Sequence, residues 1–186
     1  MKQTLESALE AVALVALAVW LGGLTILGAV AAPLVFGIVP APASADAMTA
    51  VFFRFDSIAV ASAVVVLLVE GGHSLLRRPL LRRDVARAAV TVGAAAIAIV
   101  EAMVVSPHIG RLHHEGAIRG LGAAGMELDH VHHTAESLAK GELFLLVVVL
   151  VLHAFRSLRL SPRRHGDGDP DAAPSTDRSP RAGPEA

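Results

Sequence analysis

Four long apolar runs restrict the fold of this chain more than any other feature of its sequence. They extend from Leu9 to about Phe36, from Ile58 to Val69 with an extension from Val51, from Ala86 to Val105, and from Leu143 to Phe155. A helix needs about 20 residues to cross about 30 Å of hydrocarbon, and each run reaches that length with its small-residue flanks. A helix formed by any of these runs is apolar around its whole circumference and not along one stripe. This pattern disfavours the alternative of a soluble bundle. We therefore predict an all-α, polytopic membrane protein with four transmembrane helices.

Composition supports a membrane protein and excludes several classes. Of 186 residues, 54% are hydrophobic and 18% charged, whereas soluble domains average about 45–50% and about 25%. There is no cysteine, which excludes thiol chemistry and disulfides. The net charge of -1 gives no reason to expect nucleic acid as a partner. No nucleophile or phosphate-binding motif stands in a suitable context, so we predict a lipid-embedded protein that is not an enzyme.

The domain boundaries follow from the apolar runs. We predict helices over about 8–36, 51–76, 84–106 and 136–158 within a domain of residues 1–160, a His-rich outer loop over about 107–135, and a disordered cytoplasmic tail over 161–186. The first run is longer than the core of a cleaved signal peptide, which favours a retained helix. Pro33 should kink or terminate the first helix, and Pro107 should end the third.

Positive residues predict the orientation of the helices. Arginines concentrate between runs two and three and after run four, whereas residues 37–50 contain no Arg or Lys and residues 107–139 contain only Arg111 and Arg119. The basic segments are Arg77, Arg78, Arg82, Arg83, and then Arg156, Arg159, Arg163, Arg164. Positive loops stay in the cytoplasm, so we predict that both termini are cytoplasmic in a bacterial-type inner membrane.

Charged residues at membrane depth form two predicted layers. With this topology an outer layer collects buried polar residues of both signs, namely Arg54, Asp56, Glu101, Lys140 and Glu142. Such groups are costly in lipid and need partners or a wet cavity; the alternative is that all except Glu101 face headgroups. Trp20, Gly22 and Gly23, with Pro33 further along, form a packing motif in the first helix, where small residues let helices approach closely.

The inner layer contains a second candidate set. Glu70 and His73 are three residues apart and share one helix face, and His153 reaches a similar depth. Two histidines on different helices could bind haem axially or share a metal ion. Histidines that only reach toward the membrane interface are the alternative.

Six histidines fall between the third and fourth apolar runs. Imidazole and carboxylate together suit divalent transition metals such as zinc, copper or nickel. His130 and His133 share a face if the fourth helix continues outward, and His113 or His114 would supply a third ligand. The alternatives are a solvated loop without metal and a surface that responds to pH.

Several motifs resemble those of an uncharacterised family of four-helix membrane proteins. They are the Trp-Leu-Gly-Gly sequence from Trp20, the Ala-Pro-Leu-Val-Phe sequence that includes Pro33, and the Val-Phe-Phe-Arg-Phe sequence that includes Arg54. The family carries a domain of unknown function, and its eukaryotic relatives include a transmembrane protein associated with cisplatin resistance. Pro107 and His133 resemble two further family positions, whereas a common serine is Glu136 here. The resemblance implies the four-helix topology and no particular activity.

Three classes of function follow from these patterns. The chain could handle a metal or a toxic cation through its outer histidines and buried acids. It could instead be a haem-binding redox helper that uses His73 and His153, although haem is the weaker cofactor candidate. A third class is a structural subunit that binds another membrane protein or a second copy of itself.

Overall fold

The computed structural model describes residues 2–76 and 82–160, so the predicted tail at 161–186 lies outside the described residues. The elements are α1 (Lys2–Ile26), η1 (Leu27–Ala31), α2 (Ala32–Ile38), α3 (Ala43–Leu76), α4 (Arg82–Val100), η2 (Glu101–Val105), α5 (Ser106–His114) and α6 (Gly122–Leu160). The π-helical segments η1 and η2 join their neighbours into continuous rods. The described chain therefore contains four long helical rods and no strand.

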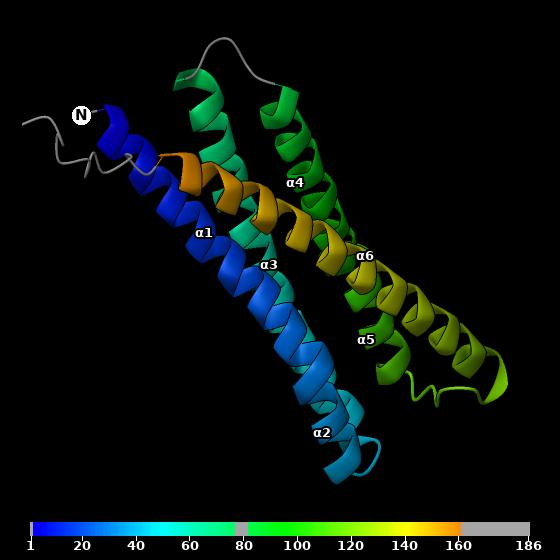
Figure 1. Ribbon diagram of the computed structural model, residues 1–186. Helices are drawn as coiled ribbons and strands as arrows, with labels where there is room; N and C mark the ends of the chain where they lie inside the picture. The colour runs from blue at the N-terminus through cyan, green and yellow to red at the C-terminus, as the bar shows by residue number, and fades with distance from the viewer. Residues whose placement is uncertain (1, 77–81, 161–186) are drawn as a thin grey trace, which may run out of the picture.

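The four rods form a closed antiparallel bundle. Contacts join α1 to α3, α3 to α4, α4 to α6 and α6 back to α1. Figure 1 shows α6 crossing α1 near the chain's N-terminus and the α5–α6 connection at the opposite end. We call the end where α1 begins and α3 ends the terminal end. The end that holds the α2–α3 and α5–α6 connections is the loop end.

Each rod is long and apolar enough to cross a membrane. The candidate spans are Thr4–Ile38, Ala43–Leu75, Asp84–His114 and Gly122–Phe155. The prediction of an all-α chain with four membrane-spanning helices is therefore confirmed. Spans of 31 to 35 residues are roughly 47–52 Å long at 1.5 Å per residue, more than about 30 Å of hydrocarbon. Part of each rod consequently extends beyond the hydrocarbon layer.

The two prolines near the loop end do not stop their helices. Pro33 and Pro107 each occupy the first turn of a helical segment that follows a π-helical turn. A π turn closes bonds five residues apart, so it moves the preceding carbonyl groups away from the proline ring. The third rod therefore continues to His114 instead of ending at about residue 106.

The predicted outer loop of residues 107–135 is mostly helical. Only residues 115–121 connect α5 to α6, and Gly116, Gly120 and Gly122 have positive φ angles of 79°, 79° and 67°. Glycine adopts such angles without the steric cost that a side chain would bring. The glycines thus reverse the chain within a short turn, and the histidine-rich sequence lies on two helices.

Between the two ends of the bundle, the core consists of closely packed apolar side chains. Leu17, Val66, Leu146 and Val149 are almost completely buried, and alanines of α3 and α4 fill the remaining contacts. Small side chains let helix backbones approach closely, which gives dense van der Waals packing in lipid. This apolar layer separates the buried polar groups of the terminal end from those of the loop end.

Candidate functional site

Buried charged residues from all four rods meet at the terminal end. His153 Nδ1 lies 2.8 Å from Glu10 Oε1, and His153 Nε2 lies 3.1 Å from Glu70 Oε1. Arg87 donates two hydrogen bonds to Glu70, from Nε to Oε1 at 2.7 Å and from Nη2 to Oε2 at 2.8 Å. None of these four side chains is more than 5% exposed. We call Glu10, Glu70, Arg87 and His153 the terminal-end network.

The terminal-end network links the bundle into a ring. Glu10 belongs to α1, Glu70 to α3, Arg87 to α4 and His153 to α6. A bidentate arginine–carboxylate pair restricts both the distance and the angle between the two helices that it joins. Buried charges are costly unless they are paired in this way. The network therefore specifies which faces of the four rods meet.

The predicted haem ligands His73 and His153 are both buried at this end. His153 is fully buried, and each of its ring nitrogens lies against a glutamate oxygen. An axial haem ligand needs a ring nitrogen that points into open space at the iron. The geometry of His153 therefore does not support the haem alternative.

A second buried polar group lies toward the loop end. The Trp20 indole Nε1 donates a 2.7 Å hydrogen bond to Glu142 Oε1, and Glu142 also hydrogen-bonds Glu101. Asp56 is close enough that its charge acts on both glutamates. Glu142 is 1% exposed and Asp56 is 9% exposed. We call Asp56, Glu101 and Glu142 the loop-end acid cluster.

The backbone explains how three acids from separate rods converge. Glu101 opens the π-helical turn η2, which packs against both α3 and α6. Asp56 lies on α3 and Glu142 on α6. Inserted π-helical turns occur often at functional sites because they redirect side chains. Trp20 completes the group from α1, a role that its assignment to a packing motif did not include.

The two basic residues predicted for this layer lie outside it. Arg54 and Lys140 are exposed, and Lys140 bonds Glu136 at 2.8 Å. Each precedes a cluster acid by two residues, and residues two apart on a helix do not share a face. Within the described residues, no Arg, Lys or His forms an ion pair with any of the three acids. The cluster therefore carries one sign of charge, not two.

The histidines of the loop end are distributed over different faces. His113 approaches His132, with ring centroids 5.7 Å apart, whereas His114, His130 and His133 are exposed. His132 lies one helical turn after the buried Leu128 and faces His113 on α5. His130 and His133 lie on other faces of α6 and are exposed. In the described part of the chain, no three His, Asp or Glu side chains are grouped to hold a metal ion. The predicted set of His130 and His133 with His113 or His114 is therefore not brought together.

Several loop-end polar residues hold the helical extensions to one another. His108 Nε2 lies 2.8 Å from Glu127 Oε1, which links α5 to α6. His113 Nδ1 lies 3.1 Å from the Thr49 hydroxyl, which links α5 to α3. An ion pair between Arg119 and Asp129 fastens the connecting turn to α6. These contacts give the loop-end residues a structural role that needs no ligand.

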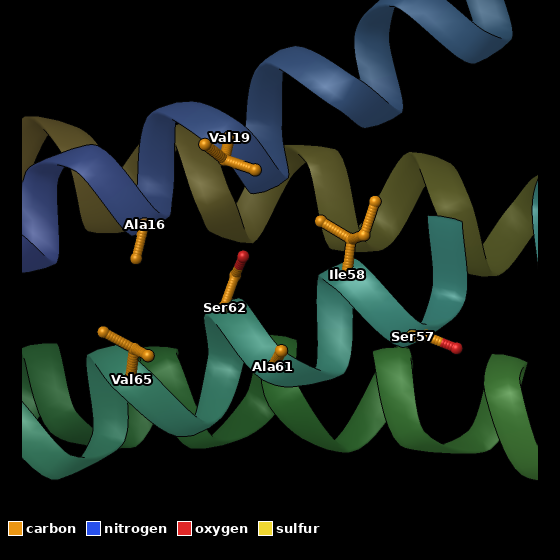
Figure 2. A pocket seen from close by; sticks show the side chains of 7 residues that line it. All are labelled: Ala16, Val19, Ser57, Ile58, Ala61, Ser62 and Val65. Carbon is orange, nitrogen blue, oxygen red and sulfur yellow. The ribbon is translucent and has the colours of Figure 1, made fainter. Parts of the chain in front are cut away.

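A shallow groove lies on the bundle surface between α1 and α3. Figure 2 shows its lining, in which Ala16 and Val19 come from α1 and the other residues from α3. The α3 residues are Ser57, Ile58, Ala61, Ser62 and Val65. The lining is almost wholly apolar, and Ser57 bonds the Phe53 carbonyl oxygen of its own helix. The groove therefore suits a lipid chain better than a charged ligand.

Three functional contacts were missed at the level of sequence. Glu10 lies near the start of an apolar run and was not singled out, Arg87 was not placed in either buried layer, and Trp20 was assigned to packing. One signal was available for Glu10, because an acid at the depth of His153 needs a partner when it faces inward. The pairing of Arg87 with Glu70 depends on how α3 and α4 are rotated about their own axes. Residue spacing within one helix does not predict that rotation.

Comparisons with known proteins give one match. The model of a protein family described as a domain of unknown function (DUF4149) matches residues 15–118. No curated protein and no solved structure matches the chain. The matched range includes Trp20, Asp56, Glu70, Arg87 and Glu101 and ends before α6 begins. Glu10, Glu142 and His153, which complete the two buried groups, lie beyond it.

Proposed function

This chain belongs to the DUF4149 family, and we propose that it is a membrane protein that binds a small hard cation, in exchange for a proton, at the loop-end acid cluster. The observation that carries the proposal is the meeting of two buried carboxyl groups, those of Asp56 and Glu142, with the half-buried carboxyl group of Glu101, without a basic partner among the described residues. Ionised groups in the membrane interior are costly unless a counter-charge is present. A proton supplies that counter-charge in the arrangement that the structure describes, in which the three acids are not grouped closely enough to hold a metal ion. A cation would supply it after the three carboxyl groups move closer together.

The oxygen atoms of the cluster support a binding role. Asp56 Oδ2 is buried and accepts no hydrogen bond. A buried acceptor without a partner costs about 1–3 kcal/mol. A cation placed beside Asp56 would remove that cost. Native buried acceptors are usually satisfied, so this unpaired oxygen supports a binding role for Asp56.

The chemistry of the donor set favours hard cations over soft ones. Carboxylate oxygens suit Na⁺, K⁺, Mg²⁺ or Ca²⁺, whereas imidazole suits zinc, copper and nickel. The hydrogen bond between Glu101 and Glu142 requires one proton, because two ionised carboxylates can only accept. Cation entry would release this proton. The resulting function is binding and exchange, not catalysis of a reaction.

Intrinsic fluorescence provides a direct test. Trp20 is the single tryptophan and there is no tyrosine, so the emission of the protein reports on the residue that bonds Glu142. Titration of the purified chain in mild detergent with Na⁺, K⁺, Mg²⁺ and Ca²⁺ should give a saturable change for at least one of them. If one proton is displaced, the apparent Kd should rise about tenfold per pH unit of acidification.

Variants identify the site of binding. Asp56→Asn should weaken binding about tenfold, equivalent to about 1.4 kcal/mol, because it removes a charge that faces the cation. Glu127→Gln is the matched control, since Glu127 is an exposed acid at the same end. Equal affinity in wild type and Asp56→Asn, or no response to any of the four cations, would contradict the proposal.

Transition-metal binding by the loop-end histidines is the competing proposal. The observation that favours it is the close approach of His113 and His132 at 5.7 Å. A Zn²⁺ response that is lost in His113→Ala and unchanged in Asp56→Asn would support it. Stable co-purification of another membrane protein, with no response to any ion, would instead favour a structural subunit.

We also propose that the loop end faces the periplasm of a bacterial-type inner membrane and that both termini are cytoplasmic. The support is the clustering of arginines at the terminal end, of which Arg82 and Arg87 belong to α4. Because the chain has no cysteine, Ala123→Cys and Arg82→Cys each give a unique label site. On intact cells an impermeant maleimide should label Ala123→Cys and leave Arg82→Cys unlabelled. The opposite pattern would reverse the orientation.

A further inference from the structure

The terminal-end network contains more acceptor atoms than a neutral histidine can satisfy. His153 is fully buried and its two ring nitrogens lie 2.8 Å and 3.1 Å from carboxylate oxygens of Glu10 and Glu70. A neutral imidazole has one N–H donor and one lone pair, and an ionised carboxylate can only accept. With ordinary neutral His153 and two ionised glutamates, one of these contacts would therefore join two lone pairs.

The Nδ1 contact with Glu10 has hydrogen-bond geometry, and the Nε2 contact with Glu70 lies at ion-pair distance. Both contacts become favourable when the three residues hold two protons. The protons can lie on both ring nitrogens, or one of them can lie on a glutamate. With His153 as imidazolium the charges of Glu10, Glu70, Arg87 and His153 sum to zero, which suits a buried position. The surroundings include His73 on α3 and Asp84 on α4, the latter with an oxygen 3.9 Å from Arg87 Nη1.

We propose that Glu10, His153 and Glu70 form a buried proton-binding site, and that the bound proton holds α1, α3 and α6 together at the terminal end. Loss of the proton leaves a lone-pair contact and one net negative charge in a low-dielectric region. Separation of α1 from α6, with entry of water, relieves both. The site thus links a proton to the packing of three helices.

This proton site is separate from the loop-end acid cluster. Ten residues separate Glu10 from Trp20 on α1, and fourteen separate Arg87 from Glu101 along the third rod. At 1.5 Å per residue these separations correspond to about 15–21 Å. The apolar layer that contains Leu17, Val66 and Val149 lies between the two sites. The inference consequently does not depend on cation binding, and either proposal can fail alone.

Counting the protons of the wild-type chain tests the site without a folding risk. Nitrogen NMR of the ¹⁵N-histidine-labelled protein in nanodiscs at pH 7 reports whether both His153 nitrogens carry protons. The signals are assigned by their loss in His153→Gln, or by through-bond transfer if that variant does not fold. Infrared spectroscopy reports any protonated buried carboxyl group. We expect two protons to be shared by Glu10, His153 and Glu70, which we call the triad. A neutral His153 ring beside two ionised glutamates would overturn the proposal.

A distance measurement tests the effect on helix packing. Leu5→Cys and Phe155→Cys place spin labels on exposed positions of α1 and α6 near the network, and the cysteine-free chain adds no other label. The distance between the labels should lengthen or broaden as pH is raised, with the same midpoint as the loss of the triad proton. Val30→Cys with Phe144→Cys is the control pair nearer the loop end and should not change at that midpoint. An unchanged terminal-end distance would overturn the role in packing.

The conservative variant Glu10→Gln keeps the contact with His153 but removes the need for a second proton. A glutamine amide can donate to or accept from a neutral imidazole, so no second proton is needed. In Glu10→Gln the helices should remain together at all pH values at which the wild-type pair separates. The same pH response in Glu10→Gln and wild type would show that this triad does not bind the proton responsible.

Discussion

Replacement of Arg87 by methionine should lower the free energy of unfolding by about 3–5 kcal/mol, because it leaves the buried Glu70 carboxylate without its two arginine hydrogen bonds. Arg87 and Glu70 side chains are each only 5% exposed, so water does not replace the lost partner. Methionine fills a similar volume, which limits the contribution of a cavity. Reversible unfolding in mixed detergent micelles measures the change.

Two further variants identify the cause of that loss. Arg111→Met removes an exposed arginine whose carboxylate partner is 3.9 Å away, and it should cost less than about 1 kcal/mol. The double variant Glu70→Leu with Arg87→Met removes both charges and should be more stable than Arg87→Met alone. If Arg87→Met and Arg111→Met had equal effects, the buried pair would not stabilise the bundle.

Substitution of Gly23 by alanine should destabilise the bundle by about 1–3 kcal/mol through overpacking. A Cβ atom at Gly23 would overlap Phe55 Cε2, far closer than van der Waals contact allows. Phe55 is 9% exposed and belongs to the core between α1 and α3, so its ring cannot move without disturbing neighbours. Thermal unfolding in detergent, followed by far-ultraviolet circular dichroism, would reveal a lower Tm.

The neighbouring glycine supplies a matched control. A Cβ at Gly22 would meet nothing within 4 Å, and alanine is more favourable than glycine within a helix by about 0.5–1 kcal/mol. Gly22→Ala should therefore be neutral or stabilising. Combining Gly23→Ala with Phe55→Leu should recover part of the loss. Similar effects of alanine at both glycines would show that close packing against Phe55 is unimportant.

The helical rods were predictable because their signal is local. An apolar run of sufficient length favours a membrane helix whatever its neighbours do, and the runs around Leu17, Val66, Ala95 and Leu146 required no tertiary information. The behaviour of Pro107 was not predictable in the same way. Whether a proline ends a helix depends on the turn before it, and the π-helical turn that lets α5 follow is not encoded in a simple residue pattern.

The depth of the buried polar residues was also predictable, whereas their partners were not. Counting along the rods placed Asp56, Glu101 and Glu142 at one level, and the structure brings these three together. The same counting placed Arg54 and Lys140 at that level, but both face outward. Depth along a helix follows from residue number, while the direction of a side chain around the axis follows from packing.

The sequence alone therefore determined that this chain consists of four membrane-spanning helices with ionisable residues at two levels, because helix length and rise are properties of each segment. The tertiary structure decided that Trp20 donates to Glu142, that Arg87 pairs with Glu70 and that Glu10 meets His153. These pairs join residues on different helices. Each pair forms only at one rotation and crossing angle of the whole rods. Apolar surfaces alone do not specify that arrangement, whereas buried polar contacts allow few alternatives to it.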